Sequence, residues 1–181
     1  MTMPTDTQTS TTGERADLLA TLANHRHFLR FTVCDLTDEQ AALHPTASDL
    51  CLGVLIKHVA EAESSWVDFT VGGPAAMAHG SEEWNAEGNV EDWRAKFAML
   101  PGETLAGVLE QYEQVARRTD ELVGTLPDLD DSHPLPDAPW FEKGARWSAR
   151  RVILHIIAET AQHTGHADII RETLDGSKSM G

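Results

Sequence analysis

Residues 148–174, SARRVILHIIAETAQHTGHADIIRETL, decide the fold, because they form the most apolar helical pattern in the chain. Eight apolar residues recur at helical spacing within this segment: Ile153, Leu154, Ile156, Ile157, Ala161, Ala167, Ile169 and Ile170. Gly176 follows as a helix-ending residue. A helix of this composition must be largely enclosed by other helices, so the segment predicts a bundle.

Three other long segments show the same helical period: residues 14–35, 50–71 and 102–126. A shorter helix is expected around residues 91–99. Prolines and glycines separate the long segments, and residues 74–90 and 127–144 read as long connections. Because no strand pair is evident, the pattern predicts an all-α four-helix bundle with long crossover connections.

The charge balance limits the partners of the protein. The chain has 181 residues, with 14 Lys and Arg against 29 Asp and Glu, for a formal net charge of −15. Such a charge repels nucleic acid and anionic membranes. No segment is apolar for the roughly 20 residues of a membrane span, and the N-terminus lacks the features of a signal peptide. We therefore expect a cytoplasmic protein that binds neither nucleic acid nor membrane.

The domain organisation is simple. Residues 1–12 are rich in Thr and Ser and predict a disordered lead-in. Residues 13–181 are long enough for a single domain with its own core. The two cysteines, Cys34 and Cys51, have apolar neighbours, and we expect both to be small buried side chains rather than redox groups.

Polar side chains recur on one face of the last predicted helix. At ~100° per residue, His155, Glu159, His163 and His166 fall within an arc of roughly 80°. A solvated helix face is the simplest interpretation, but it conflicts with the apolar character of the helix. Glu159 and His163 are one turn apart, a spacing that suits two ligands of one metal ion.

A third ligand is available on the predicted helix over residues 50–71. His58 lies there beside Val54 and Leu55, on or next to the apolar side. Alone, it would be read as a hydrogen-bonded core histidine. With Glu159 and His163 it makes a His2Glu set, which is typical of a catalytic divalent ion such as Zn2+ with a position open to water or substrate.

The remaining polar residues of the last helix have less specific assignments. His155 and His166 lie one turn to either side of the proposed ligands and are the candidate catalytic residues, orienting a ligand or handling a proton. A core histidine satisfied by a backbone carbonyl is an equal alternative for His155. Asp168 and Arg171 are three apart, and a surface ion pair is expected.

Two stretches, TASDLCLGVLIKHVAEAESSW and ILHIIAETAQHTGHADIIRE, resemble the DinB-like superfamily of metal-binding four-helix bundles. The similarity is greatest to its actinobacterial mycothiol-dependent branch, in particular the mycothiol S-transferases, with the maleylpyruvate isomerases more distant. Many superfamily members have a third histidine where this chain has Glu159, and glutamate matches the mycothiol-dependent pattern. The resemblance implies His58, Glu159 and His163 as metal ligands, mycothiol as thiol cosubstrate and a homodimer.

The function that follows is a zinc-dependent S-transferase that conjugates mycothiol to electrophiles, in detoxification. The alternatives are a mycothiol-dependent isomerase, a metal- and thiol-binding protein without turnover, and a bundle whose histidines affect only its stability. Trp66, Trp84 and Trp147 are candidates for a substrate wall, although aromatic residues at helical spacing usually belong to the core.

Overall fold

The computed structural model describes residues 13–77 and 98–179. Four long helices dominate it: α1 (Glu14–Phe31), α3 (Leu52–Gly72), α6 (Leu105–Thr125) and α7 (Ala149–Asp175). The short elements are α2 (Asp38–Ala41), the 3-10 helix η1 (Gly73–Met77), β1 (Ser132–Pro134) and β2 (Arg146–Ser148). Residues 1–12, the loop residue Trp84 and most of the short helix expected over 91–99 lie outside the described residues.

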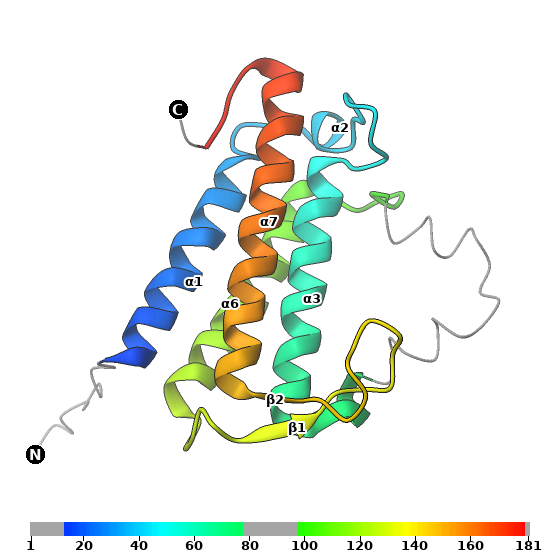
Figure 1. Cartoon of the computed structure of the whole chain (residues 1–181). Helices are drawn as coiled ribbons and strands as arrows, with labels where there is room; N and C mark the ends of the chain where they lie inside the picture. The colour runs from blue at the N-terminus through cyan, green and yellow to red at the C-terminus, as the bar shows by residue number, and fades with distance from the viewer. Residues whose placement is uncertain (1–12, 78–97, 180–181) are drawn as a thin grey trace, which may run out of the picture.

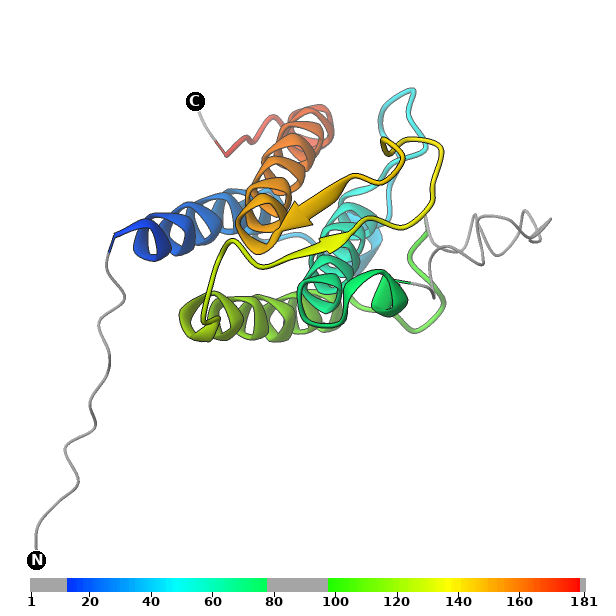
Figure 2. The same cartoon turned by 60° about the horizontal axis from the view of Figure 1, so that its bottom comes forward.

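The long helices form one bundle, in which α3 packs against both α6 and α7, and α1 packs against α7 (Figure 1). Viewed toward the end of the bundle, α1 lies across from α3, and α6 lies across from α7 (Figure 2). Because α3 and α6 run in the same direction, the connection between them is a long crossover. The predicted all-α four-helix bundle is confirmed, and no described helix is long and apolar enough to cross a membrane.

Side-chain caps begin two of the long helices. Ser148 accepts a hydrogen bond from the Arg151 amide at 3.2 Å, and Thr104 caps α6 in the same way. Gly176 ends α7 in the left-handed conformation (φ 82°), as the sequence predicted. Helix α3 starts two residues later than the expected residue 50, and Cys51 precedes its first residue.

A two-stranded antiparallel sheet was not expected from the sequence. Strands β1 and β2 pair Ser132 with Ser148 and His133 with Trp147, across the end of the bundle where α7 begins (Figure 1). Each strand has only three residues, which is too short for an alternating apolar pattern to be visible. Pro134 in β1 also favours the prediction of a loop, because proline is uncommon within strands. The sheet fixes Trp147 immediately before α7.

The end of α1 corrects two expectations. Arg171 of α7 is buried, and it donates hydrogen bonds to the carbonyl oxygens of Thr32 at 2.9 Å and Cys34 at 2.8 Å. The predicted Asp168–Arg171 pair is therefore wrong, and Arg171 pairs with Asp175 instead. Cys51 is buried as predicted, whereas Cys34, which follows the end of α1, is exposed.

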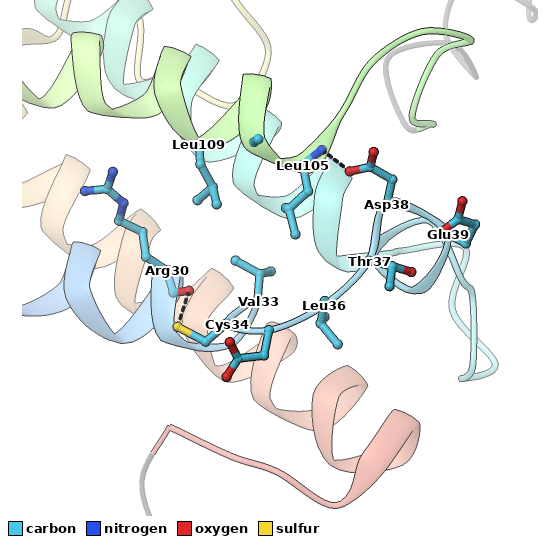
Figure 3. A pocket seen from close by; sticks show the side chains of 11 residues that line it. Arg30, Val33, Cys34, Leu36, Thr37, Asp38, Glu39, Leu105 and Leu109 are labelled. Atoms are coloured by element: carbon cyan, nitrogen blue, oxygen red, sulfur yellow. Dashed lines mark hydrogen bonds between the residues drawn. The ribbon is translucent and has the colours of Figure 1, made fainter.

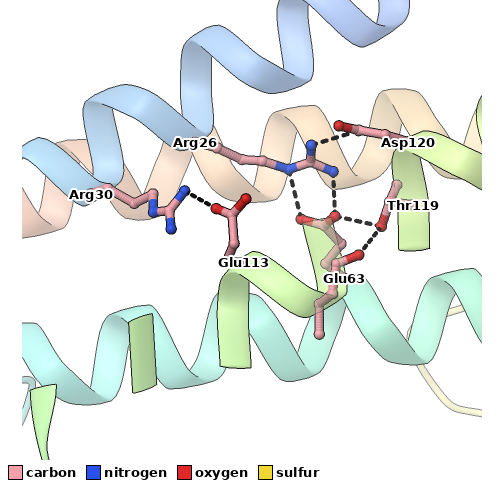
Figure 4. A network of polar contacts seen from close by, with 7 residues as sticks. Arg26, Arg30, Glu63, Glu113, Thr119 and Asp120 are labelled. Carbon is pink, nitrogen blue, oxygen red and sulfur yellow. Dashed lines mark hydrogen bonds and ion pairs between the residues drawn. The ribbon is translucent and has the colours of Figure 1, made fainter. Parts of the chain in front are cut away.

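A buried ion pair crosses the centre of the bundle (Figure 4). Arg26 of α1 donates to both carboxylate oxygens of Glu63 of α3, and the two residues are 5% and 1% exposed. Thr119 of α6 donates to Glu63, and Asp120 accepts from Arg26 at 2.7 Å. Because α1 and α3 lie on opposite sides of the bundle, this network ties together three helices through the core.

Candidate metal centre

The three predicted ligands meet where α3 faces α7. Oε1 of Glu159 lies 3.2 Å from Nε2 of His163 and 3.6 Å from Nε2 of His58. One ligand atom from each of the three residues lies within 4.8 Å of the others. Their side chains are part-buried, so the group can be reached from solvent. We call His58, Glu159 and His163 the metal triad.

The spacing of these atoms fits a divalent ion. Two ligands bound at about 2.0–2.1 Å in tetrahedral geometry lie about 3.4 Å apart. The two distances from Glu159 fall on either side of this value. Two imidazoles and one carboxylate form the donor set of a catalytic zinc site, in which a fourth position stays open. The metal triad can therefore hold one ion and still admit a ligand.

The electrostatics favour an anionic carboxylate at the centre of the triad. Hydrogen bonding to His163 and then to His58 lowers the pKa of Glu159 well below its usual range, although burial opposes the shift. The carboxylate is thus charged at neutral pH, the form that binds a metal ion.

His166 contacts His163, one of the three proposed metal ligands. Its Nδ1 lies 3.5 Å from Nδ1 of His163, while Nε2 of His163 faces Glu159. If the Nδ1 proton of His163 is donated to His166, Nε2 keeps the lone pair that a metal ion needs. This is the positioning geometry expected of a residue next to a metal ligand, and a catalytic role for His166 stays a prediction.

His155 has a different environment from the other histidines of α7. Its ring makes edge contacts with Trp66, at 4.8 Å between centroids, and with Trp147, at 5.0 Å. The two indoles are stacked on each other, 4.8 Å apart and 17° from parallel. No hydrogen bond connects His155 with the metal triad among the described residues. Its catalytic role also stays a prediction.

The aromatic surroundings of His155 predict a pH effect on stability. Burial lowers the pKa of His155, the charge of Glu159 raises it, and the charge of Arg151 lowers it again. With its pKa lowered, the folded state binds a proton less readily than the unfolded state, in which a histidine titrates near ~6.5. The contribution of His155 to stability is therefore present above that pH and is lost as the pH falls.

His155→Phe removes this titration while keeping an aromatic ring against Trp66 and Trp147. We expect the metal-free wild type to lose more stability between pH 7.5 and pH 5 than the variant, measured as urea unfolding midpoints. Equal losses in both proteins would show that His155 titrates alike in the folded and unfolded states.

A cavity of about 630 Å³ lies away from the metal triad, between the end of α1 and the start of α6 (Figure 3). Val33, Leu105 and Leu109 supply its apolar side, and Arg30 and the exposed Cys34 border it. None of the predicted site residues contributes to its lining. The cavity is therefore separate from the candidate metal centre.

Sequence reasoning selected the metal triad and His166, which the fold brings together. It assigned His155 to the same group, whereas the fold places His155 in an aromatic setting. It did not anticipate the ion pair of Arg26 and Glu63. The signal for that pair was present, since Glu63 interrupts the apolar stripe of α3 between Val59 and Trp66.

Comparison with known proteins identifies the fold and the family of the chain. A solved structure of a conserved protein from Enterococcus faecalis has a TM-score of 0.65 and 14% sequence identity, covering 92% of this chain and all of the other; it shows the fold alone. No curated protein matches the sequence. The family model of the mycothiol-S-transferases matches residues 17–176, which include the metal triad and nearly the whole helical bundle. The chain belongs to the mycothiol S-transferase family.

Proposed function

We propose that this protein is a zinc-dependent transferase that conjugates mycothiol to electrophiles, with His58, Glu159 and His163 holding the ion. The observation that carries the proposal is the convergence of these three side chains from two helices, within ligand distance of one another. Family membership supports a transferase that uses a thiol cosubstrate.

A divalent ion at this centre would supply a Lewis acid that favours the thiolate form of the cosubstrate. A free thiol with a pKa near 8.5 is only ~3% thiolate at pH 7, so full deprotonation is worth about 2 kcal/mol. Part of this gain is lost, because nucleophilicity falls with pKa at a Brønsted slope of about 0.4–0.5. Positioning of the electrophile must therefore contribute much of the rate.

The protein's own residues would prepare the reaction. Glu159 supplies the negative charge of the ligand set, and His166 orients His163 through the contact between their Nδ1 atoms. His155, whose pKa is lowered, is neutral at pH 7 and can accept a proton. We further propose that the enzyme acts in detoxification, as a cytoplasmic homodimer.

The test is a thiol-transfer assay on zinc-loaded protein with mycothiol, bacillithiol, glutathione and cysteine against one fluorogenic alkylating electrophile. We expect mycothiol alone to be consumed faster than in the uncatalysed reaction. Chelation should remove the activity, and added zinc should restore it. Faster conjugation with every thiol would contradict the mycothiol assignment. If the protein binds zinc and no thiol reacts, the S-transferase proposal fails, and isomerisation becomes the next activity to assay.

A further inference from the structure

Arg151 is an unusual cation in this acidic protein. The described arginines that pair with carboxylates are Arg26, Arg30, Arg117, Arg118, Arg150 and Arg171. Arg15 and Arg146 donate hydrogen bonds to backbone carbonyl oxygens instead. Within residues 13–77 and 98–179, Arg151 also has no carboxylate partner. Its guanidinium carbon lies 4.9 Å from the ring centroid of Trp147 instead. Arg151 is exposed, so its N–H groups can meet a ligand.

The position of Arg151 relates it to the metal triad. Arg151, His155 and Glu159 follow one another at intervals of four residues along α7, so they lie near one face of the helix. Trp147 contacts both Arg151 and His155. The charge of Arg151 also acts at His155, where it lowers the pKa. From Arg151 to Glu159 the helix rises about 12 Å.

An aromatic surface lies beside Arg151. Trp147 is partly exposed, and Phe141 packs edge-on against it at 5.8 Å between centroids. A cation beside a partly exposed indole, with Glu159 of the metal triad two turns farther along the same helix, fits a molecule with an apolar skeleton and a terminal carboxylate.

We propose that Arg151 binds the carboxylate of the electrophile, and that the preferred electrophiles are apolar carboxylic acids whose reactive carbon is directed toward the metal triad. This inference rests on the proposed S-transferase function and adds a substrate class to it. The net charge of −15 opposes the approach of an anionic substrate. A guanidinium without a carboxylate partner can offset this repulsion locally and bind the carboxylate of the substrate.

The stacked arrangement suits such a role. A planar guanidinium held over an indole loses less conformational freedom when it binds than a mobile lysine does. Its N–H edges remain available for two hydrogen bonds to one carboxylate. The neighbouring Arg150 cannot take this role as readily, because it is engaged by Glu14 and Asp130.

The first test measures binding without metal or turnover. Calorimetric titrations of the metal-free protein would use 4-phenylbutyrate and its neutral amide. We expect the carboxylate to bind more tightly than the amide, and Arg151→Gln to weaken carboxylate binding about tenfold. Lys143→Gln, which removes another exposed cation from the preceding loop, should change nothing. Equal binding of acid and amide, or equal binding by wild type and Arg151→Gln, would overturn the proposal.

The second test uses the zinc-loaded enzyme with mycothiol and two electrophiles, 4-(bromomethyl)phenylacetic acid and its amide. We expect Arg151→Gln to raise KM for the acid about tenfold, with kcat within twofold and the amide unaffected. If wild type turns over acid and amide with the same KM, the carboxylate assignment is wrong although the transferase function stands. If the acid binds through Arg151 in the first test but neither compound is conjugated, the anion site stands and the transferase function fails.

Discussion

Glu159→Gln is expected to lower mycothiol transfer by two orders of magnitude or more. The amide keeps the shape of the side chain but removes the negative charge, which lies 3.2 Å from one histidine of the metal triad and 3.6 Å from the other. Substituting a residue that hydrogen-bonds a metal ligand typically lowers metal affinity or activity about 10–100-fold. Loss of the charge of a ligand itself should lower activity at least as much. The measurement is kcat/KM for mycothiol at a fixed zinc concentration.

Glu172→Gln is the matched control, since Glu172 is an exposed glutamate on the same helix. It should keep wild-type activity. Circular dichroism of both variants will show whether the fold is retained. Activity of Glu159→Gln within fivefold of wild type would mean that Glu159 does not hold the ion.

Glu63→Ala is expected to destabilise the fold by about 3 kcal/mol or more. The substitution leaves the Arg26 guanidinium buried in the core with only Asp120 as an anionic partner. Breaking a buried ion pair by removing one partner typically costs ~3–5 kcal/mol. It also leaves the Thr119 hydroxyl without the carboxylate to which it donates. Urea unfolding, followed by circular dichroism, measures the change.

Two further variants separate the charge effect from the loss of packing. Glu61→Ala changes an exposed glutamate two residues earlier on α3 and should alter the unfolding free energy by less than ~0.5 kcal/mol. The double variant Arg26→Met with Glu63→Leu replaces the pair by apolar side chains, and it should recover much of the stability lost in Glu63→Ala. A Glu63→Ala variant as stable as Glu61→Ala would contradict the assigned role of the buried pair.

The long helices were predictable because their apolar residues repeat at 3.6-residue spacing over many turns. Ser148 and Gly176 bounded α7 correctly because capping chemistry is local. The β1–β2 pair was not predicted, because a three-residue strand is too short to show the alternation of apolar and polar residues. The end of α1 was placed too late, because the carbonyl oxygens there are bound by Arg171, a residue far away in the sequence.

The candidate metal centre was predictable for a similar reason. His155, Glu159, His163 and His166 share one helix face, a property that local geometry alone determines. Which of them meets His58 depends on how α3 packs against α7, and that is a tertiary property. The packing places Trp66 and Trp147 around His155. His155 therefore differs from the other two histidines of α7 in its neighbours, which its spacing along the helix does not reveal.

The central claim is that the metal triad binds one divalent ion. The most direct test is a zinc titration of the metal-free protein against a chromophoric chelator, for wild type, His58→Ala and His163→Ala. We predict one tightly bound ion per chain in the wild type and an affinity at least 100-fold weaker in each variant, with both variants folded. Binding of less than about 0.2 ions per chain by the wild type, or equal affinity in all three proteins, would contradict the account.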